Sequence, residues 1–172
     1  LSGLLGKTTA LQLMDLSRFK TLFLDRDGVI NTLLVDDYVK TWDEFEFTPA
    51  FKETIPFFSQ YFSRILVVTN QRGVGRGLMS EQDLIDIHKR MIDEIEAMGG
   101  RIDRIYYCTA NDNSNPNRKP NIGMGLQAKK DFPDIDFETS IMVGDSESDM
   151  LFGKRLNMHT ISTKEFSLVR LK

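Results

Sequence analysis

Short apolar runs alternate along this chain with longer segments in which apolar residues recur at helical spacing. The runs are residues 21–24, 65–69, 105–108, 140–143 and 159–161, and the helical segments are residues 50–62, 80–98, 123–132 and 149–156. Parallel strands need long crossover connections, usually helices, and they are covered on both faces. The alternation therefore predicts an α/β fold, a Rossmann-like three-layer sandwich with a central parallel sheet.

The size and charge of the chain limit the classes of protein to consider. Its 172 residues, 41% of them hydrophobic, suit one domain with a sizeable core. We expect this domain at residues 17–172 and an N-terminal extension or linker at residues 1–16. The net charge of -3 indicates neither a nucleic acid nor a membrane as a partner. Because no run is long enough to span a membrane and no signal pattern opens the chain, we expect a cytoplasmic protein, and we expect it to be a monomer.

Polar residues that could carry chemistry follow four of the apolar runs. They are Asp25 and Asp27 after the first run, Thr69 and Asn70 after the second, Arg118 and Lys119 after the third run and its loop, and Asp145 and Asp149 after the fourth. The carboxyl ends of the strands in an open α/β sheet line one crevice, where ligands bind. The predicted fold would therefore bring all four polar clusters to one place.

The residue types in these clusters suit phosphoryl transfer to or from a small phosphorylated molecule. Several carboxylates in one crevice repel one another unless a cation neutralises them, and a hard divalent ion with oxygen ligands, Mg2+, does so. A lysine and an arginine, with the hydroxyl and backbone amides of a Thr–Asn turn, suit the oxygens of a phosphoryl group.

The order of the two aspartates predicts their roles. Asp25, nearest the strand, would be held most rigidly and could attack phosphorus to form an aspartyl-phosphate. Asp27 lies past the strand end, where it could protonate the leaving oxygen and then activate water, and Gly28 would allow the tight turn. A single Asp-x-Asp-Gly sequence is more often a turn than a site, so the prediction depends on all four clusters occurring in order.

Together the four clusters resemble the motifs of the haloacid dehalogenase superfamily of Mg2+-dependent phosphatases. FLDRDGVIN (residues 23–31) resembles the first motif, Thr69 the second, Lys119 the third and GDSESD (residues 144–149) the fourth. The spacing between the motifs is too short for the cap domains that are usual in this superfamily. The chain therefore looks like a capless member.

The resemblance implies a role for each acidic residue of the motifs. Asp25 would be the nucleophile and a Mg2+ ligand. Asp27 would be the acid and base, and a ligand through its backbone carbonyl. Asp145 would be a further Mg2+ ligand, and Asp149 would support the metal site from behind.

The resemblance also implies a substrate class. The segments that look most like one branch of the superfamily, the heptose bisphosphate and histidinol-phosphate phosphatases, are residues 37–47, 69–77, 105–108 and 118–124. A member of that branch would be a phosphomonoesterase for a sugar phosphate, with D-glycero-D-manno-heptose 1,7-bisphosphate as the leading candidate. Thr69, Asn70 and Lys119 would then hold the phosphoryl group, and Arg118 would contact the substrate.

Three alternatives remain open. The substrate could be histidinol phosphate or another small metabolite. The domain could be a non-catalytic regulatory module of a larger polypeptide. The motifs also fit a nucleic-acid 3′-phosphatase, although the sequence shows no basic groove of the kind that tracks a nucleic-acid backbone.

Two positions depart from the resembled branch. Its members typically bind a structural zinc in a Cys-x-His and Cys-x-Cys loop, but here only Cys108 is present and Ala110 stands where the histidine belongs. One thiolate cannot make a tetrahedral site, so no structural zinc is expected. Ser146 stands where the branch usually has lysine. The two histidines, His88 and His159, are predicted to be packing or surface residues with no catalytic role.

Overall fold

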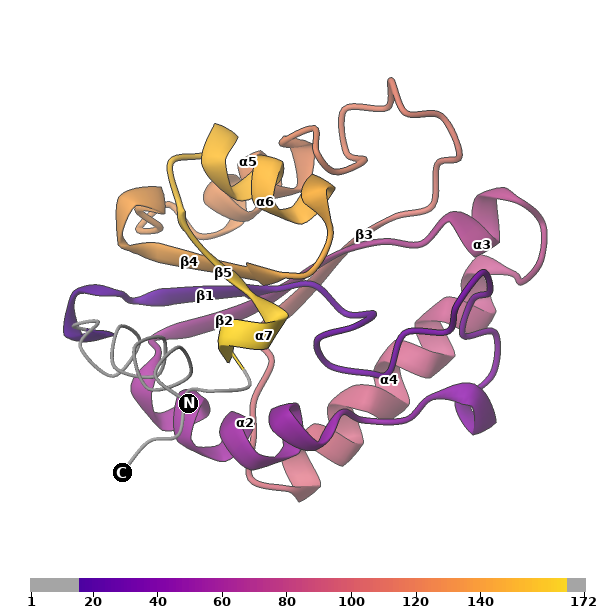
Figure 1. Ribbon diagram of the computed structural model, residues 1–172, viewed down its shortest axis with the longest axis horizontal. Coiled ribbons are helices and arrows are strands. Elements are labelled where there is room, and N and C mark those ends of the chain that lie inside the picture. Colours follow the sequence, from indigo (N-terminus) through magenta and orange to yellow (C-terminus); the bar gives the residue numbers. More distant parts are fainter. Residues whose placement is uncertain (1–15, 167–172) are drawn as a thin grey trace, which may run out of the picture.

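The structure, a computed structural model, describes residues 16–166 (Figure 1). Five strands form one sheet in the order β3-β2-β1-β4-β5, and every neighbouring pair is parallel. The strands are β1 (Thr21–Leu24), β2 (Arg64–Asn70), β3 (Arg104–Cys108), β4 (Ser140–Gly144) and β5 (His159–Ser162). The predicted parallel α/β fold is confirmed. The N-terminal extension expected at residues 1–16 lies outside the described residues except for residue 16.

Strand β1 lies at the centre of the sheet, between β2 and β4. Leu24, its last residue, is in register with Val67 of β2 and with Val143 of β4. The next residue, Asp25, still donates its backbone N–H to the carbonyl oxygen of Val143 at 3.0 Å. Because the three strands run in the same direction, the residues that follow them emerge at one edge of the sheet.

Helices cover both faces of the sheet (Figure 1). The helices on one face are α2 (Pro49–Tyr61), α4 (Glu81–Ala97) and α7 (Thr163–Phe166), and those on the other face are α5 (Gly123–Asp131) and α6 (Glu147–Arg155). Side chains of β1 alternate between the two layers, since Leu22 and Leu24 belong to one apolar core and Phe23 to the other. The three-layer sandwich is therefore confirmed.

Capping side chains determine where two of the helices begin. Ser80 and Asp83 form a capping box at the start of α4. A second capping box joins Ser146 and Asp149. As a result α6 begins at Glu147, two residues before the predicted start of this helix, because the acidic loop supplies its own cap.

Two connections of the fold correspond to the places where a cap domain would be inserted. Between β1 and α2, residues 25–48 form a loop with one short 3-10 helix, η2 (Trp42–Glu44), and the connection from β2 to β3 contains α3 (Arg72–Gly75) and α4. Within residues 16–166 neither place holds a further domain. The remaining short elements are η1 (Leu16–Arg18) and η3 (Phe137–Thr139). No helix of this part of the chain is both long and apolar enough to cross a membrane.

Candidate active site

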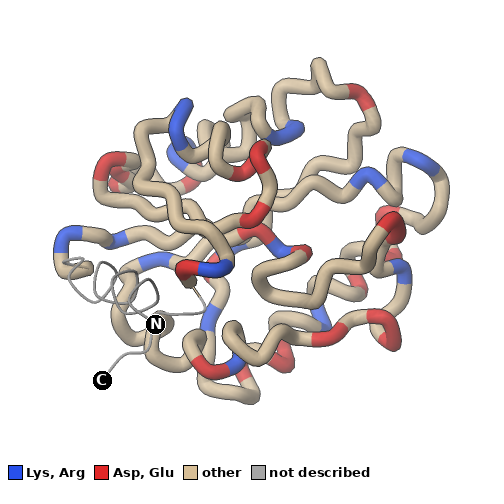
Figure 2. The backbone as a smooth tube through the Cα atoms, viewed as in Figure 1, with Lys and Arg blue, Asp and Glu red and all other residues tan. Residues whose placement is uncertain are grey.

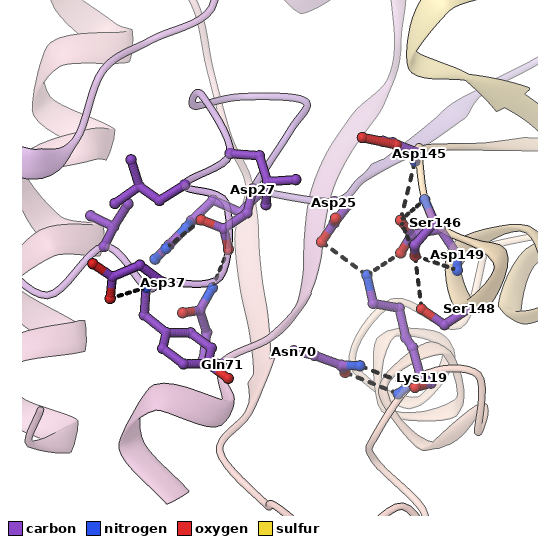
Figure 3. A pocket seen from close by; sticks show the side chains of 15 residues that line it. Asp25, Asp27, Asp37, Asn70, Gln71, Lys119, Asp145, Ser146, Ser148 and Asp149 are labelled. Atoms are coloured by element: carbon purple, nitrogen blue, oxygen red, sulfur yellow. Dashed lines mark hydrogen bonds and ion pairs between the residues drawn. The ribbon is translucent and has the colours of Figure 1, made fainter. Parts of the chain in front are cut away.

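A pocket of about 220 Å³ opens at the carboxyl ends of the central strands (Figure 3). The residues predicted for the site that line it are Asp25, Asp27, Asn70, Lys119, Asp145 and Asp149. Further walls come from the loop after β1, including Leu33 and Tyr38, and from Gln71, Ser146 and Ser148. The structure thus brings residues from all four predicted clusters to one pocket.

Lys119 is the buried cation of the pocket, with a side chain that is 2% exposed. Its Nζ donates to Oδ1 of Asp25 at 3.0 Å, to Oδ1 of Asp149 at 2.6 Å and to the carbonyl oxygen of Val68 at 2.7 Å. All three donors of the ammonium group are therefore used. Burial opposes the charge, but the two carboxylates hold the pKa of Lys119 above its usual value.

Asp25 presents one carboxylate oxygen to the pocket. Its Oδ1 accepts from Lys119, whereas no hydrogen bond from residues 16–166 reaches its Oδ2. Burial raises the pKa of Asp25 to about 7, the charge of Lys119 opposes the rise, and the charges of Asp149 and Asp27 add to it. A divalent cation at the pocket would lower this pKa again and so favour the ionised, nucleophilic form.

Asp27 has hydrogen-bond donors on both carboxylate oxygens. Oδ1 accepts from Nη2 of Arg26 at 2.8 Å and from Nδ2 of Asn31 at 3.0 Å, and Oδ2 accepts from Nε2 of Gln71 at 2.8 Å. Burial raises the pKa of Asp27, but the charge of Arg26 and these hydrogen bonds together hold it below its usual value. Figure 3 shows Asp27 beside Gln71, apart from the group formed by Asp25 and Lys119.

The two predicted phosphate-binding residues at the end of β2 have different environments. Asn70 exchanges two hydrogen bonds with the backbone of Lys119, accepting from its N–H and donating to its carbonyl oxygen, each at 3.0 Å. Thr69 is fully buried and does not line the pocket, and its hydroxyl accepts from Gln71 at 2.9 Å. Asn70 therefore fixes the Lys119 backbone, and the phosphate contacts of both residues stay predictions.

Asp149 is buried behind the loop that presents Asp145. Its Oδ2 accepts from the backbone N–H groups of Asp145 and Ser146, each at 3.2 Å, and from the Ser146 hydroxyl at 2.9 Å. A Cβ added to Gly144 would lie 2.4 Å from the Cβ of Asp149, so only glycine leaves room for this side chain. The geometry fits the supporting role predicted for Asp149.

The oxygen atoms around Gly28 are of the kind that binds Mg2+. Gly28 has φ 89°, and a Cβ added there would lie 3.2 Å from Oδ2 of Asp145, so this carboxylate faces the loop that follows Asp25. No hydrogen bond from residues 16–166 reaches the exposed Asp145 carboxylate. In the same residues no three His, Cys, Asp or Glu side chains gather as around a metal. The carboxylates of Asp25 and Asp145, the backbone carbonyl of Asp27 and waters would be the ligands of an ion bound here, and such a set of oxygen atoms suits Mg2+.

Asparagine side chains hold the loop between β3 and α5. Arg118 lies in this loop, outside the pocket lining, where its Nε donates to Oδ1 of Asn113 at 3.1 Å and its Nη1 to the carbonyl oxygen of Ala110 at 3.3 Å. The buried Cys108 has its Sγ 3.8 Å from Oδ1 of Asn115. Side-chain hydrogen bonds thus hold this loop, and the substrate contact of Arg118 stays a prediction.

Four buried polar residues near Asp27 were not identified from the sequence: Arg26, Asn31, Gln71 and His88. Arg26 and Asn31 lie within the first predicted motif, and Gln71 directly follows the Thr69–Asn70 cluster. Their positions in the sequence could therefore have marked them as site residues. His88 is in α4, where nothing in the surrounding sequence separates it from a packing residue. Its Nε2 lies 3.1 Å from Nη1 of Arg26.

Comparison with known proteins identifies the family. Residues 24–170 match the family described as "Polynucleotide kinase 3 phosphatase", which is most of the chain. The chain belongs to this family of haloacid dehalogenase phosphatases. The resemblance predicted from the motifs is confirmed.

Two curated relatives of this haloacid dehalogenase phosphatase carry the same name, D-glycero-alpha-D-manno-heptose-1,7-bisphosphate 7-phosphatase. The relative from Mycobacterium bovis is 41% identical over 130 residues, which cover 75% of this chain and 68% of the relative. The relative from Campylobacter jejuni is 37% identical over 142 residues, which cover 83% of this chain and 80% of the relative. The chain is thus similar to named sugar-phosphate phosphatases over most of its length.

A solved structure agrees with the fold of this haloacid dehalogenase phosphatase. The D,D-heptose 1,7-bisphosphate phosphatase from B. bronchiseptica, described as complexed with magnesium and phosphate, superposes with a TM-score of 0.77 at 32% identity. The superposition covers 83% of this chain and 79% of that chain. These comparisons identify the chain as a hydrolase of phosphoric monoesters.

Proposed function

We propose that this chain hydrolyses D-glycero-D-manno-heptose 1,7-bisphosphate as a Mg2+-dependent phosphomonoesterase with an aspartyl-phosphate intermediate. The observation that carries the proposal is the arrangement of Asp25, which lines the pocket and has one oxygen on the buried Lys119 and the other without a hydrogen-bond donor among residues 16–166. A carboxylate placed in this way can attack phosphorus while the lysine balances charge. The names of the curated relatives support the choice of substrate.

In the first step, Oδ2 of Asp25 attacks the phosphorus atom and the bond from phosphorus to the sugar oxygen breaks. Asp27 donates a proton to that oxygen, so the sugar leaves as an alcohol. The phosphate dianion beside Asp27 supplies the reason for its protonation, because a neighbouring negative charge raises the pKa of a carboxyl group. Mg2+ bound by Asp25, Asp145 and the Asp27 carbonyl would neutralise charge on the phosphoryl oxygens.

In the second step, a water molecule attacks the phosphorus of the aspartyl-phosphate. Asp27, now ionised, takes a proton from this water. The bond from Asp25 to phosphorus breaks, which releases inorganic phosphate and restores the free carboxylate. Lys119 keeps its contact to Asp25 through both steps and limits the movement of the nucleophile.

The distribution of charge supports a small substrate over a polynucleotide. Along residues 16–166, positions of Lys and Arg are interspersed with positions of Asp and Glu (Figure 2). Proteins that bind single-stranded nucleic acid use a positively charged groove that follows the backbone. The description of the matched family nevertheless makes a 3′-phosphorylated oligonucleotide a necessary comparison substrate.

A substrate panel tests the proposal. Phosphate release would be measured from both anomers of the heptose bisphosphate, histidinol phosphate, p-nitrophenyl phosphate and a 3′-phosphorylated oligonucleotide, with Mg2+ or with EDTA. We expect the highest kcat/KM for a heptose bisphosphate, loss of turnover in EDTA, and 31P NMR signals showing that the phosphate on C7 is removed. Preference for another substrate would replace the heptose assignment.

Two variants test the mechanism in the same panel. Asp25→Asn should abolish turnover because an amide cannot serve as the nucleophile. Asp93→Asn, a matched change at an exposed aspartate of α4, should leave turnover unchanged. Full activity of Asp25→Asn would rule out the aspartyl-phosphate mechanism.

A further inference from the structure

The guanidinium group of Arg26 is buried at the active site, with the whole residue 1% exposed. Nη2 donates to Oδ1 of Asp27 at 2.8 Å, and Nη1 lies 3.1 Å from Nε2 of His88. Its Nε has no hydrogen-bond partner among residues 16–166, and the centroid of the Phe45 ring lies 5.9 Å from the guanidinium carbon. In the described part of the chain, only Asp27 and His88 hold this buried cation through hydrogen bonds to its side chain.

The contact between Arg26 and His88 determines which ring nitrogen of His88 carries the proton. A guanidinium group can only donate hydrogen bonds, so Nε2 of His88 must accept and the ring proton must be on Nδ1. His88 is 5% exposed, and burial together with the charge of Arg26 lowers its pKa to about 3. The ring is therefore a neutral acceptor at physiological pH. A residue that only filled space would not need an acceptor atom at this position.

Asp27 depends on Arg26 for its orientation. Asn31 shares Oδ1 with Arg26, and Gln71 holds Oδ2. Gln71 also donates to the hydroxyl of Thr69, so the proton of that hydroxyl is directed elsewhere. If Arg26 shifted, Oδ1 would lose its charged donor and keep only the amide of Asn31, so the two neutral amides of Asn31 and Gln71 alone would hold the carboxylate.

We propose that His88 is a positioning residue for proton transfer, which acts through Arg26 to hold the Asp27 carboxylate in the orientation that serves the leaving oxygen. This inference rests on the proposed function, since it takes Asp27 as the acid and base. Its physical basis is a chain of two hydrogen bonds, from His88 in α4 to Arg26 and from Arg26 to Asp27 in the loop after β1. A displacement of the acid by about 1 Å is enough to slow a reaction by up to about 100-fold.

The test compares two amide variants that differ in reach. His88→Gln places an amide oxygen close to the position of Nε2 and keeps an acceptor for Arg26. His88→Asn has the same chemical group but is too short to reach that position. We expect near-normal activity for His88→Gln and a loss of about 10-fold to 100-fold in kcat/KM for His88→Asn on an alkyl phosphate.

The readout that separates positioning from stability is dependence on the leaving group. An alkyl oxygen needs a proton to leave, whereas p-nitrophenolate leaves well without one. kcat/KM for p-nitrophenyl phosphate should therefore fall by less than about 3-fold in His88→Asn, while the alkyl substrate is affected much more. Ile95→Ala, a core change on the same helix, should affect both substrates equally.

Each outcome decides the inference. A larger loss on the alkyl substrate, restored by His88→Gln, supports it. Equal losses on both substrates, or equal losses in the two amide variants, would overturn it. If His88→Asn does not fold, His88→Leu carries the same substrate comparison. A wild-type protein with no Asp25-dependent turnover on any substrate would instead refute the proposed function.

Discussion

The ammonium group of Lys119 lies 2.6 Å from Oδ1 of Asp149, and both side chains are at most 2% exposed. The same ammonium group lies 3.0 Å from Oδ1 of Asp25. One buried cation thus joins the residue that follows β1 to the first turn of α6. Removing it would leave two carboxylates without their common partner.

Lys119→Met should therefore lower the free energy of unfolding by about 3 to 5 kcal/mol, because it leaves buried charge unpaired. Urea denaturation monitored by circular dichroism measures the loss. In a double-mutant cycle with Asp149→Asn, the two changes should cost less together than the sum of their separate effects. Additive costs would show that Lys119 and Asp149 do not interact in solution.

The two capping boxes of the chain provide a matched pair of variants. Ser146→Ala and Ser80→Ala should each lower the free energy of unfolding by about 1 kcal/mol, since each removes the acceptor at a helix start. Only Ser146→Ala should also lower kcat/KM, because Ser146 contacts Asp149 in the loop that presents Asp145. Equal activity of the two variants would argue against a role for this cap in the site.

Asp145 and Asp149 are expected to respond differently to the same substitution. Asp145→Asn should change the free energy of unfolding by no more than about 0.5 kcal/mol, because the carboxylate is exposed and has no partner in residues 16–166. Mg2+ should raise the melting temperature of the wild type but not of Asp145→Asn. Asp149→Asn should destabilise the protein through loss of the Lys119 contact. An unchanged Mg2+ response in Asp145→Asn would exclude this residue as a ligand.

The stability of the metal-free protein should depend on pH through two opposing titrations. The pKa of Asp25 rises to about 7 in the folded protein, so folding takes up a proton and this contribution grows as pH falls from about 7 toward 4. The pKa of His88 falls to about 3, so the unfolded chain takes up a proton below about 6.5 and this contribution is lost as pH falls. Between about pH 4.5 and 6 the two contributions to the slope of stability against pH therefore cancel.

Variants at these positions should reveal the opposite signs. His88→Gln should become more stable as pH falls from 6 to 4.5, and Asp25→Asn less stable, each by up to about 1.4 kcal/mol per pH unit relative to the wild type. Urea titrations in EDTA at several pH values measure both slopes. Slopes of the same sign in the two variants would contradict the pKa shifts.

The fold was predictable because each strand of the sheet is a short apolar run between turns and helices. The sequence also placed Asp25, Lys119 and Asp145 at one edge of the sheet, because parallel strands put their carboxyl ends together. It could not show that Thr69 is fully buried with its hydroxyl bonded to Gln71, since this depends on side-chain packing. Whether Thr69 contacts phosphate stays a prediction.

The contacts around Asp27 could not be read from sequence for a different reason. Arg26 lies between the two predicted catalytic aspartates, where a charged side chain would be expected to face water, yet it is buried. Its partner His88 is far along the chain in α4. A hydrogen bond between distant segments leaves no periodic signal in either of them. The sequence also did not show what Ser146 does at the position where the resembled branch usually has lysine. In the structure, Ser146 is the N-cap residue of α6 and forms a capping box.

The central position of β1 also determines when activity can arise during folding. Thr21 pairs with Ser140, so the two halves of the chain must close a long loop before the sheet is complete. Contacts of this range form slowly compared with helices. On the ribosome, Asp25, the proposed nucleophile, is therefore made well before the pocket that surrounds it, and a refolding chain should regain helical signal before it regains turnover.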